Sequence, residues 1–206
     1  MTDTSTLLDP GLAIDDATAD RLFRTARTTA TFTDADVTDE QLATVYDLVK
    51  WGPTGLNSSP LRVLVVRTPE ARARLVARVP DGNKERVANA PVTLVLGYDP
   101  AFHEHLDVLA PHMPGMRENF AQSEETRLHM GRTNALLQAG YFVVGLRAAG
   151  LAAGPMNGNF DEIDAEFFAG NGWRSLLVVN VGVADGEGTH RPRAPRLAFE
   201  QVSQVL

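Results

Sequence analysis

The hydrophobic residues of the chain fall into helical and extended patterns that alternate along its length. Apolar residues at helical spacing, each run opened by a capping residue or a proline, predict helices over residues 15–29, 39–51, 69–79 and 161–168. The second helix has the clearest start, because Thr38 and Gln41 form a capping-box pattern. Residues 100–120 hold three prolines, three histidines and scattered apolar residues, which predicts short helices or a mobile excursion.

Three runs rich in β-branched residues predict strands, over residues 61–67, 91–98 and 175–183. The last run is apolar at almost every position and reads as a central strand, and residues 151–156 form a further short extended segment. No composition shift marks a linker. The pattern predicts one α+β domain over residues 15–206, preceded by a loose arm over residues 1–14.

One long helix is predicted from Ser123 to Ala149, closed by Gly150. Its second half, residues 135–146, is apolar on nearly every face, so it should be buried in a core or against a partner subunit. Gly140 and Gly145 lower helix propensity and are typical of close helix packing.

Composition and charge exclude several classes of function. The chain has 206 residues, a net charge of −7 and no cysteine. An acidic chain is a poor match for nucleic acid or an anionic membrane, and no apolar run approaches the length of a membrane span. Without cysteine there is no thiol nucleophile, disulfide or thiolate metal site. No secretory signal is seen at the N-terminus, so a cytoplasmic location is expected.

The loop from Lys50 to Pro60 joins the second helix to the first strand and is made mainly of turn formers and small polar residues. Such a loop costs conformational entropy and exposes backbone N–H groups, which favours a role in ligand binding. A second loop of turn formers, residues 154–159, follows the short extended segment. It offers backbone amides to a planar ligand, or it is an ordinary turn that leads into a helix. Asn134 enters the buried helix and needs partners, from either a ligand or neighbouring backbone.

Arginines form two groups that are distant in sequence: Arg24 and Arg27, and Arg191, Arg193 and Arg196. They could converge on one phosphate, because the guanidinium donates bidentately to such anions. The alternative is that they are surface arginines paired with some of the 26 acidic residues.

The usual catalytic motifs are missing. The histidines lack the spacing of a metal site, and there is no nucleophile elbow, Walker sequence or glycine-rich dinucleotide fingerprint.

Taken in order, these segments resemble the FMN-dependent nitroreductase family over residues 22–206. The matching segments are Arg27-Thr28-Thr29, the loop Gly52–Pro60, the strand start Ala90-Pro91-Val92, the helix Asn134–Tyr141, the loop Gly154–Gly158, and Arg193 with Arg196. Ser59 and Asn157 depart from the family pattern, in which Gln and Glu are common. Thr29 replaces a serine and keeps the hydroxyl.

The resemblance implies a central, mostly antiparallel sheet flanked by helices, and an intertwined homodimer that holds FMN at its interface. NADH or NADPH would be the electron donor, and no general acid is identified beyond the candidates His112 and His129. The cofactor-binding residues implied by the resemblance are Arg27, Thr28, Thr29, Pro53, Thr54, Asn57, Asn134, Pro155, Met156, Asn157, Gly158, Arg193 and Arg196.

The motifs are most similar to the malonic semialdehyde reductase branch, which acts in pyrimidine degradation. This similarity implies reduction of a small carbonyl acid, with Arg117, Arg127 or Arg132 as candidate partners of its carboxylate. Two alternatives remain open: a broad nitro- or quinone reductase, and a flavin-binding or storage protein without turnover.

Overall fold

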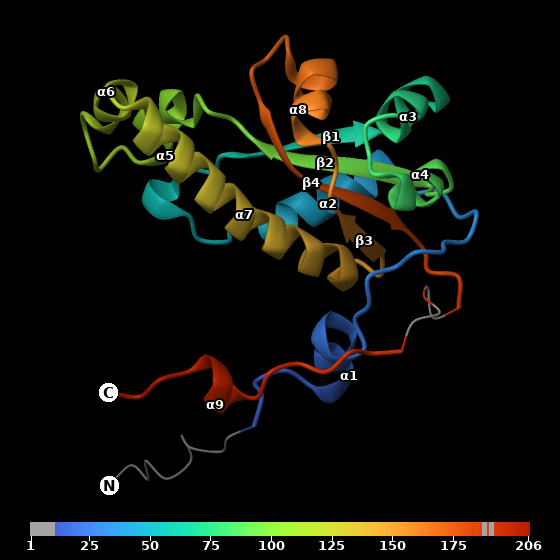
Figure 1. Ribbon diagram of the computed structural model, residues 1–206. Helices are drawn as coiled ribbons and strands as arrows, with labels where there is room; N and C mark the ends of the chain where they lie inside the picture. The colour runs from blue at the N-terminus through green and yellow to red at the C-terminus, as the bar shows by residue number, and fades with distance from the viewer. Residues whose placement is uncertain (1–10, 187–188, 190–191) are drawn as a thin grey trace, which may run out of the picture.

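A four-stranded antiparallel sheet forms the centre of the molecule (Figure 1). The computed structural model describes residues 11–186, 189 and 192–206. The strand order is β1-β2-β4-β3, and every neighbouring pair is antiparallel. The strands are β1 (Leu61–Val66), β2 (Val92–Tyr98), β3 (Ala152–Met156) and β4 (Arg174–Gly182). The α+β prediction and the central position of the 175–183 run are therefore confirmed.

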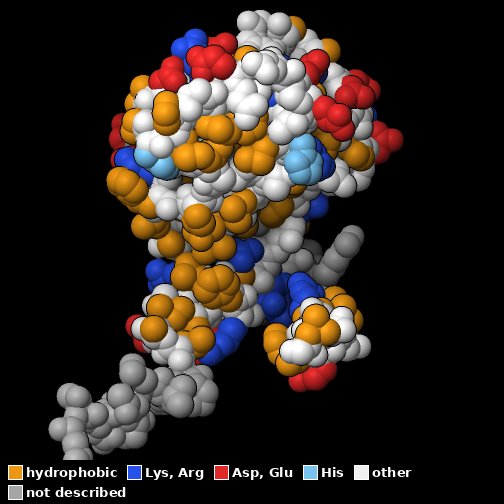
Figure 2. Space-filling view, turned by 90° about the vertical axis from the view of Figure 1, so that its left-hand side faces the viewer, with side chains coloured by type: hydrophobic (Ala, Val, Ile, Leu, Met, Phe, Trp, Pro, Cys, Tyr) orange, Lys and Arg blue, Asp and Glu red, His pale blue; other side chains and the backbone are white. Residues whose placement is uncertain are grey.

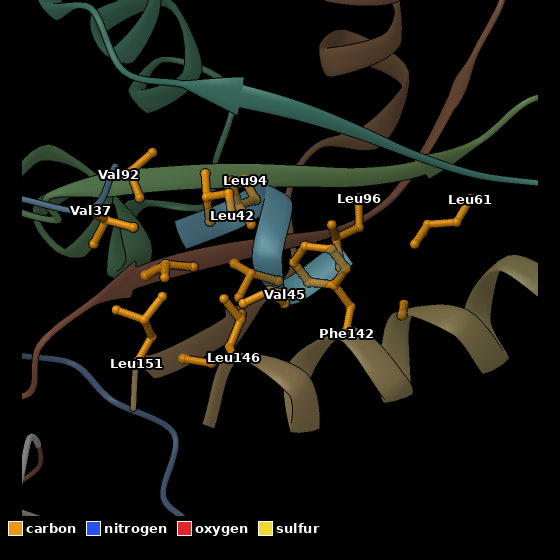
Figure 3. Packing of buried hydrophobic residues seen from close by; sticks show 14 residues of the cluster. Val37, Leu42, Val45, Leu61, Val92, Leu94, Leu96, Phe142, Leu146 and Leu151 are labelled. Atoms are coloured by element: carbon orange, nitrogen blue, oxygen red, sulfur yellow. The ribbon is translucent and has the colours of Figure 1, made fainter. Parts of the chain in front are cut away.

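Helices cover both faces of the sheet, because its inner strands are apolar on both sides. On β2, Leu94 and Leu96 belong to one core cluster, whereas Val95 belongs to the other. The first cluster includes Phe142 and Leu146 of α7 (Glu124–Ala148), which point toward the sheet in Figure 3. Helix α2 (Asp39–Val49) adds Leu42 and Val45 to the same cluster.

The remaining helices are short. On the opposite face, the second cluster takes residues from α3 (Pro69–Val76), α4 (Asp81–Ala88), α8 (Phe160–Ile163) and the π-helix η5 (Asp164–Phe168). The predicted excursion contains η4 (Phe102–His105), α5 (Leu106–Leu109) and α6 (Met116–Ala121), which confirms short helices there. The others are α1 (Asp16–Ala19), η2 (Asp20–Arg24), η3 (Gly55–Asn57) and α9 (Phe199–Val202).

Two helix predictions need correction. The predicted helix 15–29 ends at Arg24, since Thr29 instead donates its backbone N–H to Ala153 O (3.0 Å) beside β3. The predicted helix 69–79 ends at Val76, and α4 follows it unpredicted. Helix α4 has a single buried residue, Val87, so it shows no hydrophobic periodicity.

Helix α7 packs closely on α2, as its glycines suggested. A Cβ at Gly145 would lie 2.3 Å from Val49 Cγ1, so only glycine fits there. Gly140 is different, because a Cβ at that position would meet no atom within 4 Å. The same exposed face of α7 carries Leu136, Leu137 and Tyr141, which are 41%, 46% and 43% exposed.

Two terminal segments extend from the body on one side (Figure 1). The N-terminal segment (residues 11–24) holds α1 and η2, and the C-terminal segment (residues 192–206) holds α9. Both expose large apolar side chains, among them Phe23 at 56% and Phe199 at 72%. Figure 2 shows hydrophobic side chains gathered across one face of the body and on both extensions below it. In the part of the chain that the structure describes, no helix is long and apolar enough to cross a membrane.

Candidate functional site

Five arginines from distant parts of the chain line one cavity of about 730 Å³. Arg27 follows η2, Arg86 lies on α4, and Arg147 lies in the last turn of α7. Arg193 and Arg196 come from the C-terminal segment. Among the described residues that line this arginine pocket there is no Asp or Glu, although the chain as a whole carries a charge of −7.

Arg27 from the first arginine group of the sequence lines this pocket together with Arg193 and Arg196 from the second. Arg24 instead pairs with Asp16 (2.8 Å) and Asp20 (3.2 Å) on the surface, as the alternative interpretation expected. Arg191 lies outside the described residues. Thr28 lines the pocket, whereas Thr29 is buried behind it, 4% exposed.

Three of the arginines hold one short backbone segment, residues 26–29. Arg193 Nη2 donates to Ala26 O (2.9 Å), Arg147 Nη2 donates to Arg27 O (3.1 Å), and Arg86 Nη2 donates to Thr29 O (3.3 Å). The phosphate segment predicted from the sequence is thus fixed by side chains from α4, α7 and the C-terminal segment.

Strand β3 supports the same segment from below. A Cβ at Gly154 would lie 2.3 Å from Thr29 O, a separation at which the backbone would have to move. Only glycine therefore allows β3 to approach residues 26–29 this closely, which explains the glycine that opens the predicted 154–159 loop.

A buried polar network anchors Arg86. The side chain of Asn180 on β4, which is fully buried, donates from Nδ2 to Arg86 O (2.7 Å) and accepts at Oδ1 from Thr93 (2.8 Å). At the same C-terminal end of α4, Arg72 donates to carbonyl groups of residues 87, 88, 90 and 91, which satisfies the end of the helix. Helix α4 is thereby fixed to the sheet, and Arg86 with it.

The electrostatics of the pocket favour an anion. Burial, and then the charge of nearby Arg193, lower the pKa of Arg147, but an arginine remains cationic at neutral pH. Five cationic side chains around one cavity repel one another, and a phosphate relieves that repulsion while accepting several N–H groups at once.

The 154–159 loop lies beside the arginine pocket. Asn83 of α4 donates from Nδ2 to Asn157 O (3.1 Å), and the adjacent Gly82 lines the cavity. Met156 points into the second core cluster, so its side chain serves packing. Gly158 lies against Ile163 Cδ1, 2.5 Å from where a Cβ would stand.

The loop from Lys50 to Pro60 lies away from the arginine pocket. Polar side chains of the loop and of α7 form the hydrogen bonds that stabilise it. Asn134 Oδ1 accepts from Gly55 N (2.7 Å), and Asn134 Nδ2 donates to Met130 O (2.9 Å). Thr54 Oγ1 accepts from Ser59 N (3.2 Å), and Asn57 Nδ2 donates to Leu109 O (2.9 Å). The partners of Asn134 are thus neighbouring backbone groups, as one of the two sequence interpretations held.

Within one chain, the predicted cofactor residues form two separate groups. Asn134 touches the loop and Arg147 touches the arginine pocket, and both lie on α7. At 1.5 Å per residue they are about 20 Å apart along the helix axis. Arg27, Thr28, Arg193 and Arg196 line the pocket with Asn157 and Gly158 nearby, whereas Pro53, Thr54, Asn57 and Asn134 belong to the loop.

The remaining candidates do not join either group. Arg117 pairs with Asp107 (3.1 Å), and Arg127 donates to Phe120 O (3.1 Å). His112, His129 and Arg132 are exposed. Across the described ranges, no group of His, Asp and Glu side chains could hold a metal ion.

Sequence reasoning missed Arg86 and Arg147. Arg147 had a usable signal, because it is the one charged residue among the apolar positions from Ala135 to Ala148. Arg86 had none, because it lies in a helix that the sequence pattern did not reveal.

A sheet covered by helices, with an anion pocket at its edge, is the architecture of a cofactor-binding α+β protein. The model of the nitroreductase family matches residues 23–183. The chain belongs to the nitroreductase family. A protein of Streptomyces coelicolor, provisionally named an NADH dehydrogenase/NAD(P)H nitroreductase, is 50% identical over 192 residues, which are 93% of this chain and 97% of that protein.

Solved structures share the fold. A nitroreductase family protein from Streptococcus pneumoniae superposes with a TM-score of 0.76 at 23% identity, covering 90% of this chain and 98% of that one. A provisionally assigned nitroreductase from Exiguobacterium sibiricum, solved in complex with FMN, superposes with a TM-score of 0.76 at 16% identity. That comparison covers 95% of this chain and 99% of the other.

Proposed function

We propose that the protein is an FMN-dependent NAD(P)H oxidoreductase. The observation that carries this proposal is the arginine pocket, in which five guanidinium groups from distant parts of the chain line a cavity of about 730 Å³. A phosphate monoester is close to a dianion at neutral pH and accepts several N–H donors, so the donor set fits the phosphate of FMN. Membership of the nitroreductase family, whose FMN complexes share this fold, agrees with the assignment.

The residues of the pocket divide the work of binding. Arg27, Arg193 and Arg196 would hold the phosphate, with the Thr28 hydroxyl beside them. Asn157 and Gly158, whose loop is tied to α4, would meet the edge of the flavin ring. Bound FMN would supply the chemistry, by taking a hydride from NADH or NADPH and delivering it to an acceptor. The protein would position the ring and leave one face open.

A homodimer would complete the site. Within one chain, the loop that holds Pro53, Thr54 and Asn57 and the arginine pocket contact α7 at points about 20 Å apart, which is too far for them to share a small ligand. The loop of a second copy could lie beside the pocket instead. The apolar face of α7 around Gly140 is exposed in one chain, and the extended terminal segments expose further apolar side chains. A second copy is the natural cover for these surfaces.

Two classes of acceptor are proposed, each from a different observation. The motif similarity favours malonic semialdehyde or a similar small carbonyl acid, whereas the names of the curated relatives favour nitro compounds. Comparison of kcat/KM for malonic semialdehyde, a nitroaromatic and a quinone separates these two candidates. A storage protein without turnover would hold FMN but show no bleaching of the flavin on addition of NADH or NADPH. A cytoplasmic location stays a prediction.

The proposal is tested by the affinity of the flavin-stripped protein for FMN, measured from flavin fluorescence. Arg196→Ala removes one charge-assisted contact, worth about 1.5–3 kcal/mol, so the dissociation constant should rise by roughly 10- to 100-fold. Arg67→Ala is the control, because Arg67 pairs with Asp36 and Asp39 away from the pocket. Equal affinity of the two variants would contradict the assignment.

A further inference from the structure

The backbone of the Lys50–Pro60 loop adopts a conformation that most residues avoid. Leu56, Asn57 and Ser59 all have positive φ angles, of 57°, 51° and 40°. A side chain beyond glycine costs free energy there, least for asparagine, and such residues persist where the surrounding structure holds them. Three of them within four positions indicate a loop whose shape is fixed by its contacts.

Those contacts come largely from the helical excursion, which we define as residues 99–122. Leu56 packs against a small hydrophobic core within the excursion, formed by Phe102, Leu106, Ala110 and Phe120. This core is separate from the two clusters on the sheet. The excursion therefore packs against the loop and against α7, which adds Met130 to the same core and donates from Arg127 to Phe120 O.

Asn57 supplies the one side-chain hydrogen bond between loop and excursion in the described structure. Its Nδ2 donates to Leu109 O (2.9 Å), the carbonyl at the end of α5. A last-turn carbonyl has no partner within its helix, so this bond caps α5 from outside. After α5 and the buried Ala110 comes the exposed stretch of residues 111–115, which carries His112 and Met113.

We propose that Asn57 is a positioning residue, which ties α5 to the loop and thereby sets the place of residues 111–115 as one wall of the acceptor site. The proposal rests on the proposed function, in which the loop lines the flavin site. It gives the amide of Asn57 a role other than the cofactor contact expected from the sequence. Asn57 acts through Leu109 and touches neither FMN nor the acceptor in this account.

Glycine and aspartate variants separate the bond from the backbone conformation. Asn57→Gly accepts the positive φ without strain and removes the amide, and Asn57→Asp keeps the shape but loses the N–H donor. Ser59→Gly is the matched control. It introduces the same glycine freedom at another left-handed position, while the backbone bonds of Ser59 to Thr54 and Arg62 remain possible.

The experiment measures three quantities for each variant: the dissociation constant of FMN, the KM for menadione at saturating NADH or NADPH, and amide hydrogen exchange in residues 106–113. For Asn57→Gly and Asn57→Asp, we expect menadione KM and exchange to rise by about three- to tenfold, as loss of one neutral hydrogen bond implies, with FMN affinity within about twofold of wild type. Ser59→Gly should stay within about twofold of wild type in all three.

Two results would overturn the proposal. Exchange and KM that match those of Ser59→Gly would mean that the Asn57–Leu109 bond positions nothing. A large loss of FMN affinity, shared by both Asn57 variants and absent from Ser59→Gly, would make Asn57 a cofactor ligand. A wild-type protein that binds no FMN would instead sink the proposed function and the acceptor role together, and the exchange data would still decide whether the bond holds α5.

Discussion

The arginine pocket and the Lys50–Pro60 loop were both expected to bind the cofactor, but their polar groups are arranged in opposite ways. In the pocket, five cationic side chains line one cavity, and the described lining holds no Asp or Glu. At the loop, the side chains of Thr54, Asn57 and Asn134 form hydrogen bonds with backbone groups of the protein. The charge of the pocket therefore favours an anion, whereas the side chains at the loop stabilise the conformation of its backbone.

The largest effect on stability and FMN affinity is expected from a larger side chain at Gly154, where β3 approaches residues 26–29. Gly154→Val places a side chain where even a Cβ would lie 2.3 Å from Thr29 O. We expect a loss of about 1–3 kcal/mol in the free energy of unfolding, from overpacking, and a large fall in FMN affinity because residues 26–29 must move. Urea unfolding and FMN titration measure the two effects.

Gly170→Ala is the control for that variant, because a Cβ there would meet no atom within 4 Å. If Gly154→Val bound FMN as well as Gly170→Ala does, the segment held by the arginines would not be the phosphate site.

Arg147 tests the charge of the pocket without blocking it. Arg147→Met keeps much of the apolar stem but removes the charge and the bonds to Leu22 O (3.4 Å) and Arg27 O. Loss of a charge-assisted contact between Arg147 and the phosphate should weaken FMN binding by about 1.5–3 kcal/mol. Calorimetric titration of FMN into the stripped variant measures this, with Arg67→Met beside it. Equal heats and affinities would show that Arg147 is only a structural brace.

Asn134 tests the loop side of the comparison. Asn134→Leu leaves Gly55 N without its acceptor in a site where the side chain is 7% exposed. Loss of a hydrogen bond of this kind costs about 0.5–1.5 kcal/mol net, so the thermal midpoint should fall. Phosphate affinity of the pocket, measured with inorganic phosphate, should stay unchanged. A variant that lost phosphate binding but kept its thermal midpoint would reverse the roles that we assign to the two regions.

The smallest effect concerns pH. Burial, and then the charge of Arg127, lower the pKa of His103 in the helical excursion below its usual 6.5. The neutral imidazole is thus favoured in the folded state, so its contribution to stability is present above pH 6.5 and is lost as pH falls through the lowered pKa. His103 is only half-buried, so solvent screening keeps the effect small.

Urea unfolding between pH 7 and pH 5 should therefore show a shallower loss of stability in His103→Asn than in wild type. An unchanged slope would mean that His103 does not sense its surroundings in this way.

Sequence patterns predicted most of the fold because most elements are amphipathic or apolar. The capping box at Thr38 and Gln41 is present as expected, with hydrogen bonds of 3.2 and 2.9 Å. Helix α4 could not be found, because one buried valine gives no period. The first helix was drawn too long, because nothing in the sequence revealed that Thr29 would pair with Ala153 across the fold.

The sequence predicted the residues of the site that are recognised by their charge, but not the hydrogen-bond partners of its polar side chains. Arg27, Arg193 and Arg196 were recognisable as a group, since clustered arginines in an acidic chain need an explanation. The partner of Asn57 was not, because Leu109 lies 52 residues away and its carbonyl has no signature in the sequence.

The central claim is that the arginine pocket of one chain and the loop of a second copy enclose one FMN. Sedimentation velocity of the purified protein, followed at the flavin absorbance band, tests it most directly. The account predicts that flavin sediments with the protein as one species of about twice the 22.3 kDa chain mass, with one FMN per chain. A colourless boundary, or flavin that moves with a single 22.3 kDa chain, would contradict it.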